Sequence, residues 1–190
     1  MKRSKGIRGM VVFLFLICLL VGYYFYLSNK VGGNEAETET TKVQEVLLRD
    51  LSRNYPASTK EVLRYYSELL QCMYNEECSE QELEQMAERA MEICDADLVS
   101  YQSEEFITRL KSDVTAYKEQ DVQISSYKTS SSTDVEYFTK DGRECASLFC
   151  SYTLRKGTSL QILEEVFIMR KDEDGHWKIF GWDEASAVEE

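Results

Sequence analysis

Hydrophobic residues recur at every third or fourth position through most of residues 41–120, and this spacing predicts four amphipathic helices. A Ser or Thr followed three residues later by Glu or Gln is a start signal, because the two side chains can cap N–H groups that the first helical turn leaves free. Three of the expected helices follow such a motif: Thr41-x-x-Gln44, Ser58-x-x-Glu61 and Ser79-x-x-Glu82.

Single residues predict the end of the first helix and the start of the fourth. Pro56 disfavours helical backbone at the residue before it, so the first helix should end near Asn54. Ser103 is the expected cap of the fourth helix. The buried side of that helix is expected to carry Phe106, Leu110, Val114 and Tyr117. Residues 95–101, between the third and fourth helices, have room for a short strand.

After Asp121 the hydrophobic period changes from 3.6 to two, which predicts β-strands. The expected strands cover residues 122–124, 135–139, 144–154, 160–171 and 176–182. Asp141-Gly142 is typical of a tight hairpin. One face of residues 144–154 is strongly apolar and holds Ala146, Leu148, Cys150, Tyr152 and Leu154. Helices followed by hairpins predict an α+β fold with helices packed on an antiparallel sheet of four to six strands.

The first thirty residues have a different pattern. Met10 to Leu27 is a run of 18 residues without a charge, and as a helix it would span about 27 Å, close to the hydrocarbon thickness of a bilayer. Four basic residues precede the run, which favours a cytoplasmic N-terminus. We therefore expect a cytoplasmic tail (1–8), a transmembrane helix (9–27), a linker (28–41) and an extracytoplasmic domain (42–190). A cleaved signal peptide is the alternative, although aromatic residues stand where small residues should precede cleavage.

Charge narrows the choice of partners. Five of the 22 basic residues and none of the 34 acidic ones lie in the first 30 positions, so the rest of the chain carries a net charge of −17. A domain this acidic is repelled by phosphate backbones, and we expect no nucleic-acid partner. The expected partners are the membrane, through residues 9–27, and an unidentified protein or small molecule.

Cysteine spacing gives no metal motif. Five of the six cysteines lie beyond the apolar run, no C-x-x-C occurs, and the chain has one histidine, so we expect no zinc site. Cys72 and Cys78 flank the end of a predicted helix and are candidates for a disulfide, with buried free thiols as the alternative. No phosphate-binding glycine loop or nucleophile motif is present, and no cofactor is expected.

The closing hairpin Asp174-Gly175-His176-Trp177-Lys178-Ile179 and the order of elements over residues 58–184 resemble the nuclear-transport-factor-two-like superfamily. Together with the N-terminal run, the chain also resembles uncharacterised single-span membrane-anchored bacterial proteins. The first resemblance implies a curved, cone-shaped sheet whose helices enclose a pocket. Enzymes of that superfamily place an Asp or an Asp/His pair in the pocket. Here His176 lies at a hairpin rim and does not match that position, so no catalytic residue is assigned.

Within such a pocket, Glu164 and Glu165 are the polar candidates for ligand binding. They are adjacent in a strand, so one of them faces inward if the strand is regular, whereas a bulge would expose both. Tyr152 is a further candidate, because tyrosine can line a sugar or steroid pocket.

Three functions remain open at this point. We expect a membrane-anchored extracytoplasmic binding or interaction module, since no catalytic motif is present. An isomerase or dehydratase would need one of the two glutamates in a closed pocket with a raised pKa. A structural subunit of a cell-envelope complex would depend on the membrane span.

Overall fold

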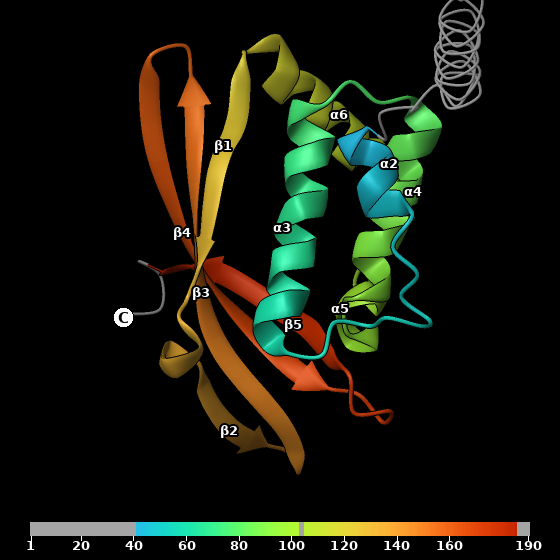
Figure 1. Cartoon of the computed structure of the whole chain (residues 1–190), viewed down its shortest axis with the longest axis vertical. Helices are drawn as coiled ribbons and strands as arrows, with labels where there is room; N and C mark the ends of the chain where they lie inside the picture. The colour runs from blue at the N-terminus through green and yellow to red at the C-terminus, as the bar shows by residue number, and fades with distance from the viewer. Residues whose placement is uncertain (1–40, 103–104, 186–190) are drawn as a thin grey trace, which may run out of the picture. The chain divides into compact units, whose positions relative to one another are not determined.

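Helices fill the first half of the described chain and strands the second half (Figure 1). The computed structural model describes residues 41–102 and 105–185. The expected membrane helix (9–27) and all but the last residue of the expected linker (28–41) lie outside these ranges. Every helix within them is too short or too polar to span a membrane.

Three helices begin where the capping motifs predicted. The side chains of Thr41, Ser58 and Ser79 accept hydrogen bonds from the backbone N–H groups of the third helical residues. The structure contains α2 (Lys42–Leu47), α3 (Thr59–Asn75), α4 (Glu80–Glu92), α5 (Ala96–Ser100) and α6 (Phe106–Glu119). Ser103, the expected cap of α6, lies outside the described residues.

Two of these elements differ from the prediction. The first helix, α2, ends at Leu47 rather than near Asn54, because the carboxylate of Asp50 accepts the backbone N–H groups of Ser52 and Arg53 and favours a turn there. Residues 95–101 form the helix α5 and not a strand. The Asp95 carboxylate caps α5 by accepting the N–H of Asp97.

The strands form one antiparallel sheet. They are β1 (Val122–Thr129), β2 (Glu136–Lys140), β3 (Arg143–Lys156), β4 (Ser159–Lys171) and β5 (Trp177–Glu184). The order is β1-β3-β4-β5, and β2 pairs with the first half of β3 while β1 pairs with its second half. A short 3-10 helix, η1 (Ser132–Asp134), separates β1 from β2. The Asp141-Gly142 hairpin is confirmed, with φ of 52° and 76°, as a type I′ turn requires.

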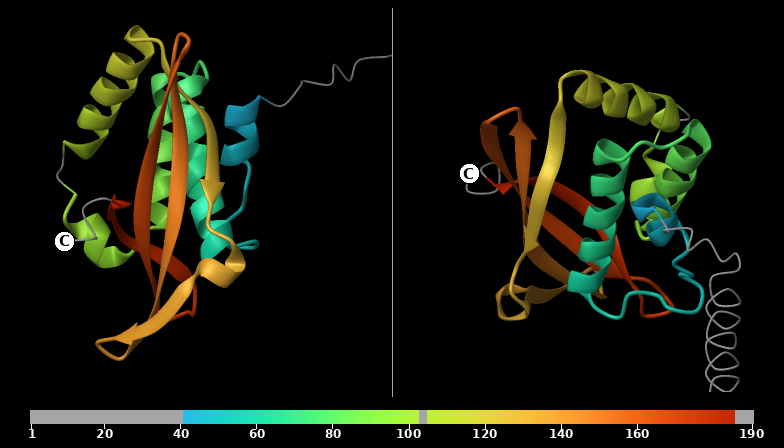
Figure 2. Two further views of the ribbon diagram at one scale, coloured as in Figure 1. Left: turned by 90° about the vertical axis from the view of Figure 1, so that its left-hand side faces the viewer. Right: turned by 45° about the horizontal axis from the view of Figure 1, so that its top comes forward.

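The core lies between α3 and one face of the sheet (Figures 1 and 2). From Ala146 to Cys150 the alternation predicted along β3 is confirmed, since Ala146, Leu148 and Cys150 are buried whereas Phe149 on the opposite face is 51% exposed. Cys145, which the alternation placed on the half-polar face, is also buried. Phe167 on β4 and Ile179 on β5 are also fully buried. The fold is therefore α+β, with helices on the apolar face of an open five-stranded antiparallel sheet.

The register of β4 settles how the two adjacent glutamates point. Pairing between β3 and β4 continues without interruption from Cys145↔Arg170 to Lys156↔Ser159, so there is no bulge at Glu164 and Glu165 on this side. The irregularity lies between Ile168 and Met169 on the pairing with β5. Glu164 and Glu165 thus point to opposite faces of the sheet.

Candidate functional site

A hollow lies between α3, the neighbouring helices and the sheet. It consists of two cavities, of about 230 Å³ on the sheet side and about 200 Å³ on the helix side. The two cavities share the residues Tyr66, Leu70, Tyr74 and Trp182. We use "the hollow" for these two cavities together. Small side chains on α4, such as those of Ala87 and Ala90, leave room on the helix side.

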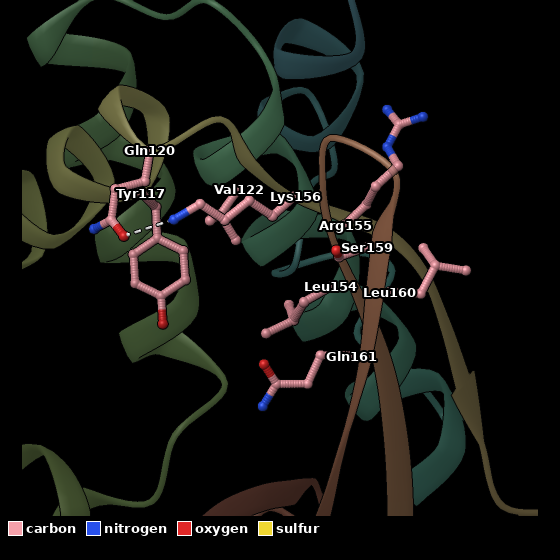
Figure 3. Close-up of a pocket in the computed structure, with 9 residues that line it drawn as sticks. All are labelled: Tyr117, Gln120, Val122, Leu154, Arg155, Lys156, Ser159, Leu160 and Gln161. Carbon is pink, nitrogen blue, oxygen red and sulfur yellow. Dashed lines mark hydrogen bonds between the residues drawn. The ribbon is translucent and has the colours of Figure 1, made fainter.

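An open groove of about 480 Å³ adjoins the hollow where α6 meets the β3–β4 hairpin (Figure 3). It shares Tyr117 and Leu154 with the sheet-side cavity, so the groove and the cavity adjoin, and we refer to the groove as the entrance. The Lys156 ammonium donates a hydrogen bond to Gln120 Oε1 across this entrance, at 3.2 Å. The entrance is therefore polar and basic, whereas the hollow behind it is not.

Aromatic side chains form much of the wall of the hollow. The ring centroids of Tyr66 and Trp182 are 5.7 Å apart, and those of Tyr74 and Tyr117 are 5.1 Å apart. Trp182 also stacks on the buried ring of Phe167, at 5.8 Å between centroids. The contact with Phe167 links the partly exposed ring of Trp182 to the core, because Phe167 is fully buried.

Glu165 is the charged group of the hollow. Its side chain is half-buried in the sheet-side cavity, whereas Glu164 is exposed on the opposite face. Burial raises the pKa of the Glu165 carboxyl, and the carboxylate of Glu184, its cross-strand neighbour on β5, raises it further. The described residues that line the hollow include no Lys, Arg or His. Of the two adjacent glutamates, the structure places only Glu165 in the hollow.

Tyr152 lines the same cavity with its ring, but its hydroxyl is engaged in the core. The hydroxyl oxygen lies 3.0 Å from Ser67 Oγ on α3, and Ser67 in turn donates to the carbonyl of Leu63 at 2.9 Å. Cys150 Sγ lies 3.7 Å from the same Ser67 oxygen. Burial raises the pKa of the Tyr152 hydroxyl. Tyr152 therefore contributes an apolar surface to the hollow, and its polar end ties the sheet to α3.

The candidate disulfide is absent: Cys72 and Cys78 are both free thiols. Cys72 is buried near Lys42 and Glu76, and burial raises its pKa to about 11. Cys78 lies instead near Lys118. The two thiols thus have different surroundings beside the end of α3. Their raised pKa values disfavour the reactive thiolate.

A second group of polar side chains lies in the turn before β5. One ligand atom each from Asp172, Asp174 and His176 lies within 4.8 Å of the others, which is a spacing compatible with a metal ion. The Asp172 carboxylate already accepts the backbone N–H groups of Asp174 and His176. The His176 ring stacks on Tyr55 with 4.3 Å between centroids. These interactions account for the group as part of the hairpin turn.

Comparison with curated proteins found no match. A family described as a domain of unknown function, DUF6715, matches residues 1–182, which is nearly the whole chain. The match covers the N-terminal apolar run as well as the helices and strands that surround the hollow. The chain therefore belongs to the DUF6715 family.

Proposed function

We propose that this chain is a membrane-anchored extracytoplasmic binding module of the nuclear-transport-factor-two-like type, and that the hollow holds a small, largely apolar ligand. The observation that carries the proposal is the hollow itself. Its two adjoining cavities have an apolar and aromatic lining with one ionisable carboxyl, which is the usual composition of a small-molecule site. Helices packed on one face of an antiparallel sheet support the proposed fold type.

The proposed location is supported by the uncharged run Met10–Leu27 and the basic residues before it. This location predicts the result of a fusion experiment. Alkaline phosphatase fused to the C-terminus of the full chain should be active in intact bacterial cells, because that enzyme folds only outside the cytoplasm, and the protein should stay with the membrane fraction. An inactive fusion, or release of the mature domain from the membrane, would contradict the anchored arrangement.

The ligand site can be tested with a neutral probe before any ligand is identified. Xenon enters dry apolar cavities, so pressurising the full chain in lipid nanodiscs should shift the methyl NMR signals of Leu70 and Leu110, which line the hollow. The methyl groups of Leu48 and Ile162 are an internal control, because they are exposed. Equal or absent shifts in the two sets would show that the hollow is not a ligand cavity, and the proposal would fail.

An isomerase or dehydratase is a second candidate function, and one observation favours it. The pKa of Glu165 is raised by burial and by Glu184, and a carboxyl with a raised pKa is a candidate general acid or base. Such an enzyme would also need a group that stabilises the developing charge. Tyr66, Tyr74 and Tyr117 line the hollow, and their hydroxyls are candidate donors.

The raised pKa of Glu165 predicts a pH-dependent effect on stability. The folded state binds the Glu165 proton more tightly than the unfolded state does, so the carboxylate destabilises the fold as pH rises above the ordinary value of 4.5. Glu165→Gln should therefore give a higher Tm at pH 7 than the unsubstituted chain. The gain should disappear near pH 3.5. Glu164→Gln is the matched control, and an equal gain there would refute the burial argument.

A further inference from the structure

The negative charge at the hollow has no positively charged partner among the described residues. Glu165 and Glu184 are direct cross-strand neighbours, and directly paired residues of antiparallel strands point to the same side of the sheet. Within residues 41–102 and 105–185, neither carboxylate has an ion-pair partner. Glu184 is exposed to water, whereas Glu165 is half-buried, so the charge that lacks compensation lies inside the hollow.

The groups that face Glu165 from neighbouring elements supply no positive charge. These groups are Glu184 on β5, Cys150 and Tyr152 on β3, Tyr66 and Tyr74 on α3, and Tyr117 on α6. The entrance carries two basic residues. Lys156 is engaged with Gln120 and Arg155 with Gln123. A ligand with a positive charge would therefore find an uncompensated carboxylate behind an apolar wall.

The aromatic rings of the hollow also favour a positively charged ligand. Elsewhere in the described chain, four rings already have a cation of the protein over them. Arg49 lies over Tyr65, Arg170 over Phe180, Lys171 over Trp177 and Lys178 over Tyr55, at 4.2–5.1 Å from the ring centroids. No described cation lies in this way over Tyr66, Tyr74 or Trp182 in the hollow. The faces of Trp and Tyr rings attract cations, and the ring of Trp182 is 41% exposed, so a ligand can reach it.

We infer that the ligand of the hollow is a small organic cation with an apolar body, held by the carboxylate of Glu165 and the rings of Tyr66 and Trp182. This inference rests on the proposed function, because it names the ligand class of the same site. The ammonium group lies beside Glu165, and the apolar body lies against the alanine and leucine side chains of the helix-side cavity. Shape alone would admit a neutral ligand, so the positive charge of the ligand is the specific claim.

Three water-soluble probes of similar size test the claim. Benzyltrimethylammonium, benzyl alcohol and phenylmethanesulfonate carry a positive, zero and negative charge on the same aromatic body. Their affinities would be measured by calorimetry with the full chain in nanodiscs, and empty nanodiscs would provide the blank. We expect the cation to bind about tenfold more tightly than the alcohol, as about 1.4 kcal/mol of charge and ring interactions implies. The sulfonate should bind most weakly.

Two variants test whether the preference for the cationic probe depends on Glu165. Glu165→Gln should remove most of the preference for benzyltrimethylammonium over benzyl alcohol. Glu164→Gln, on the same strand but the opposite face, should change neither. Thermal unfolding of each variant confirms that it is folded.

The remaining outcomes separate the two proposals. If the cation and the alcohol bind equally, or if Glu165→Gln leaves the preference intact, the inference is overturned while a ligand-binding hollow remains. If none of the three probes binds although xenon enters the hollow, the inference also fails. If xenon does not enter, the proposed function and the inference fail together.

Discussion

Replacing Asp95 by alanine is expected to lower the free energy of unfolding by about 3 kcal/mol, the largest effect of any single charged residue in the described domain. Asp95 is buried between α4 and α5, and its carboxylate accepts hydrogen bonds from the Arg170 guanidinium on β4, one of them at 2.8 Å. It also caps α5. The substitution would leave Arg170, itself only 15% exposed, without its buried partner.

Asp97→Ala is the matched control, because Asp97 contacts the same guanidinium but is 61% exposed. An exposed pair contributes about 0–1 kcal/mol, so this variant should be nearly neutral. Burial works to raise the pKa of Asp95, but Arg170 and the N–H of Asp97 together hold it below 3.8. The stabilisation is therefore present above about pH 4 and declines as pH falls further. Equal losses in Asp95→Ala and Asp97→Ala by urea denaturation would contradict this account.

Phe167→Ala is expected to cost about 3–5 kcal/mol, the range for removal of a buried aromatic ring. Phe167 is fully buried at the centre of β4 and packs against both Tyr66 and Trp182. Its loss should also disturb the wall of the hollow, so the variant should bind benzyltrimethylammonium more weakly at temperatures where it is still folded.

The control for this variant is Phe149→Ala on the neighbouring strand. Phe149 lies on the opposite face of the sheet and is half-exposed, so its removal should cost less than about 1 kcal/mol and leave ligand binding unchanged. Urea denaturation of the two variants gives the comparison. Similar losses for both would mean that the two faces of the sheet are equally buried in solution, contrary to this structure.

Local patterns in the sequence predicted most of the fold. The hydroxyl caps at Thr41, Ser58 and Ser79 each mark a helix start, since capping depends only on residues three positions apart. The Asp141-Gly142 turn was also predictable, because its backbone conformation favours these two residue types. The alternation along β3 identified the face of the sheet that carries the core.

Predictions that depended on distant residues were weaker. Residues 95–101 form the helix α5, and its cap Asp95 is held by Arg170, which lies 75 positions away. The sequence placed Glu164 and Glu165 in one strand but left open which of them faced inward, since that depends on the pairing of β3 with β4. The proximity of Glu165 to Glu184 and Trp182 depends in the same way on the pairing of β4 with β5.

The titration of Glu165 itself is the most direct test of a cation site in the hollow. The carboxyl carbon of Glu165 can be followed by NMR in the full chain, with Glu165→Gln to assign its signal. We predict a pKa above the ordinary 4.5 in the free protein, and a lower pKa once benzyltrimethylammonium is bound, because the bound cation stabilises the carboxylate. A pKa at the ordinary value, or one that the cation does not move, would contradict the account.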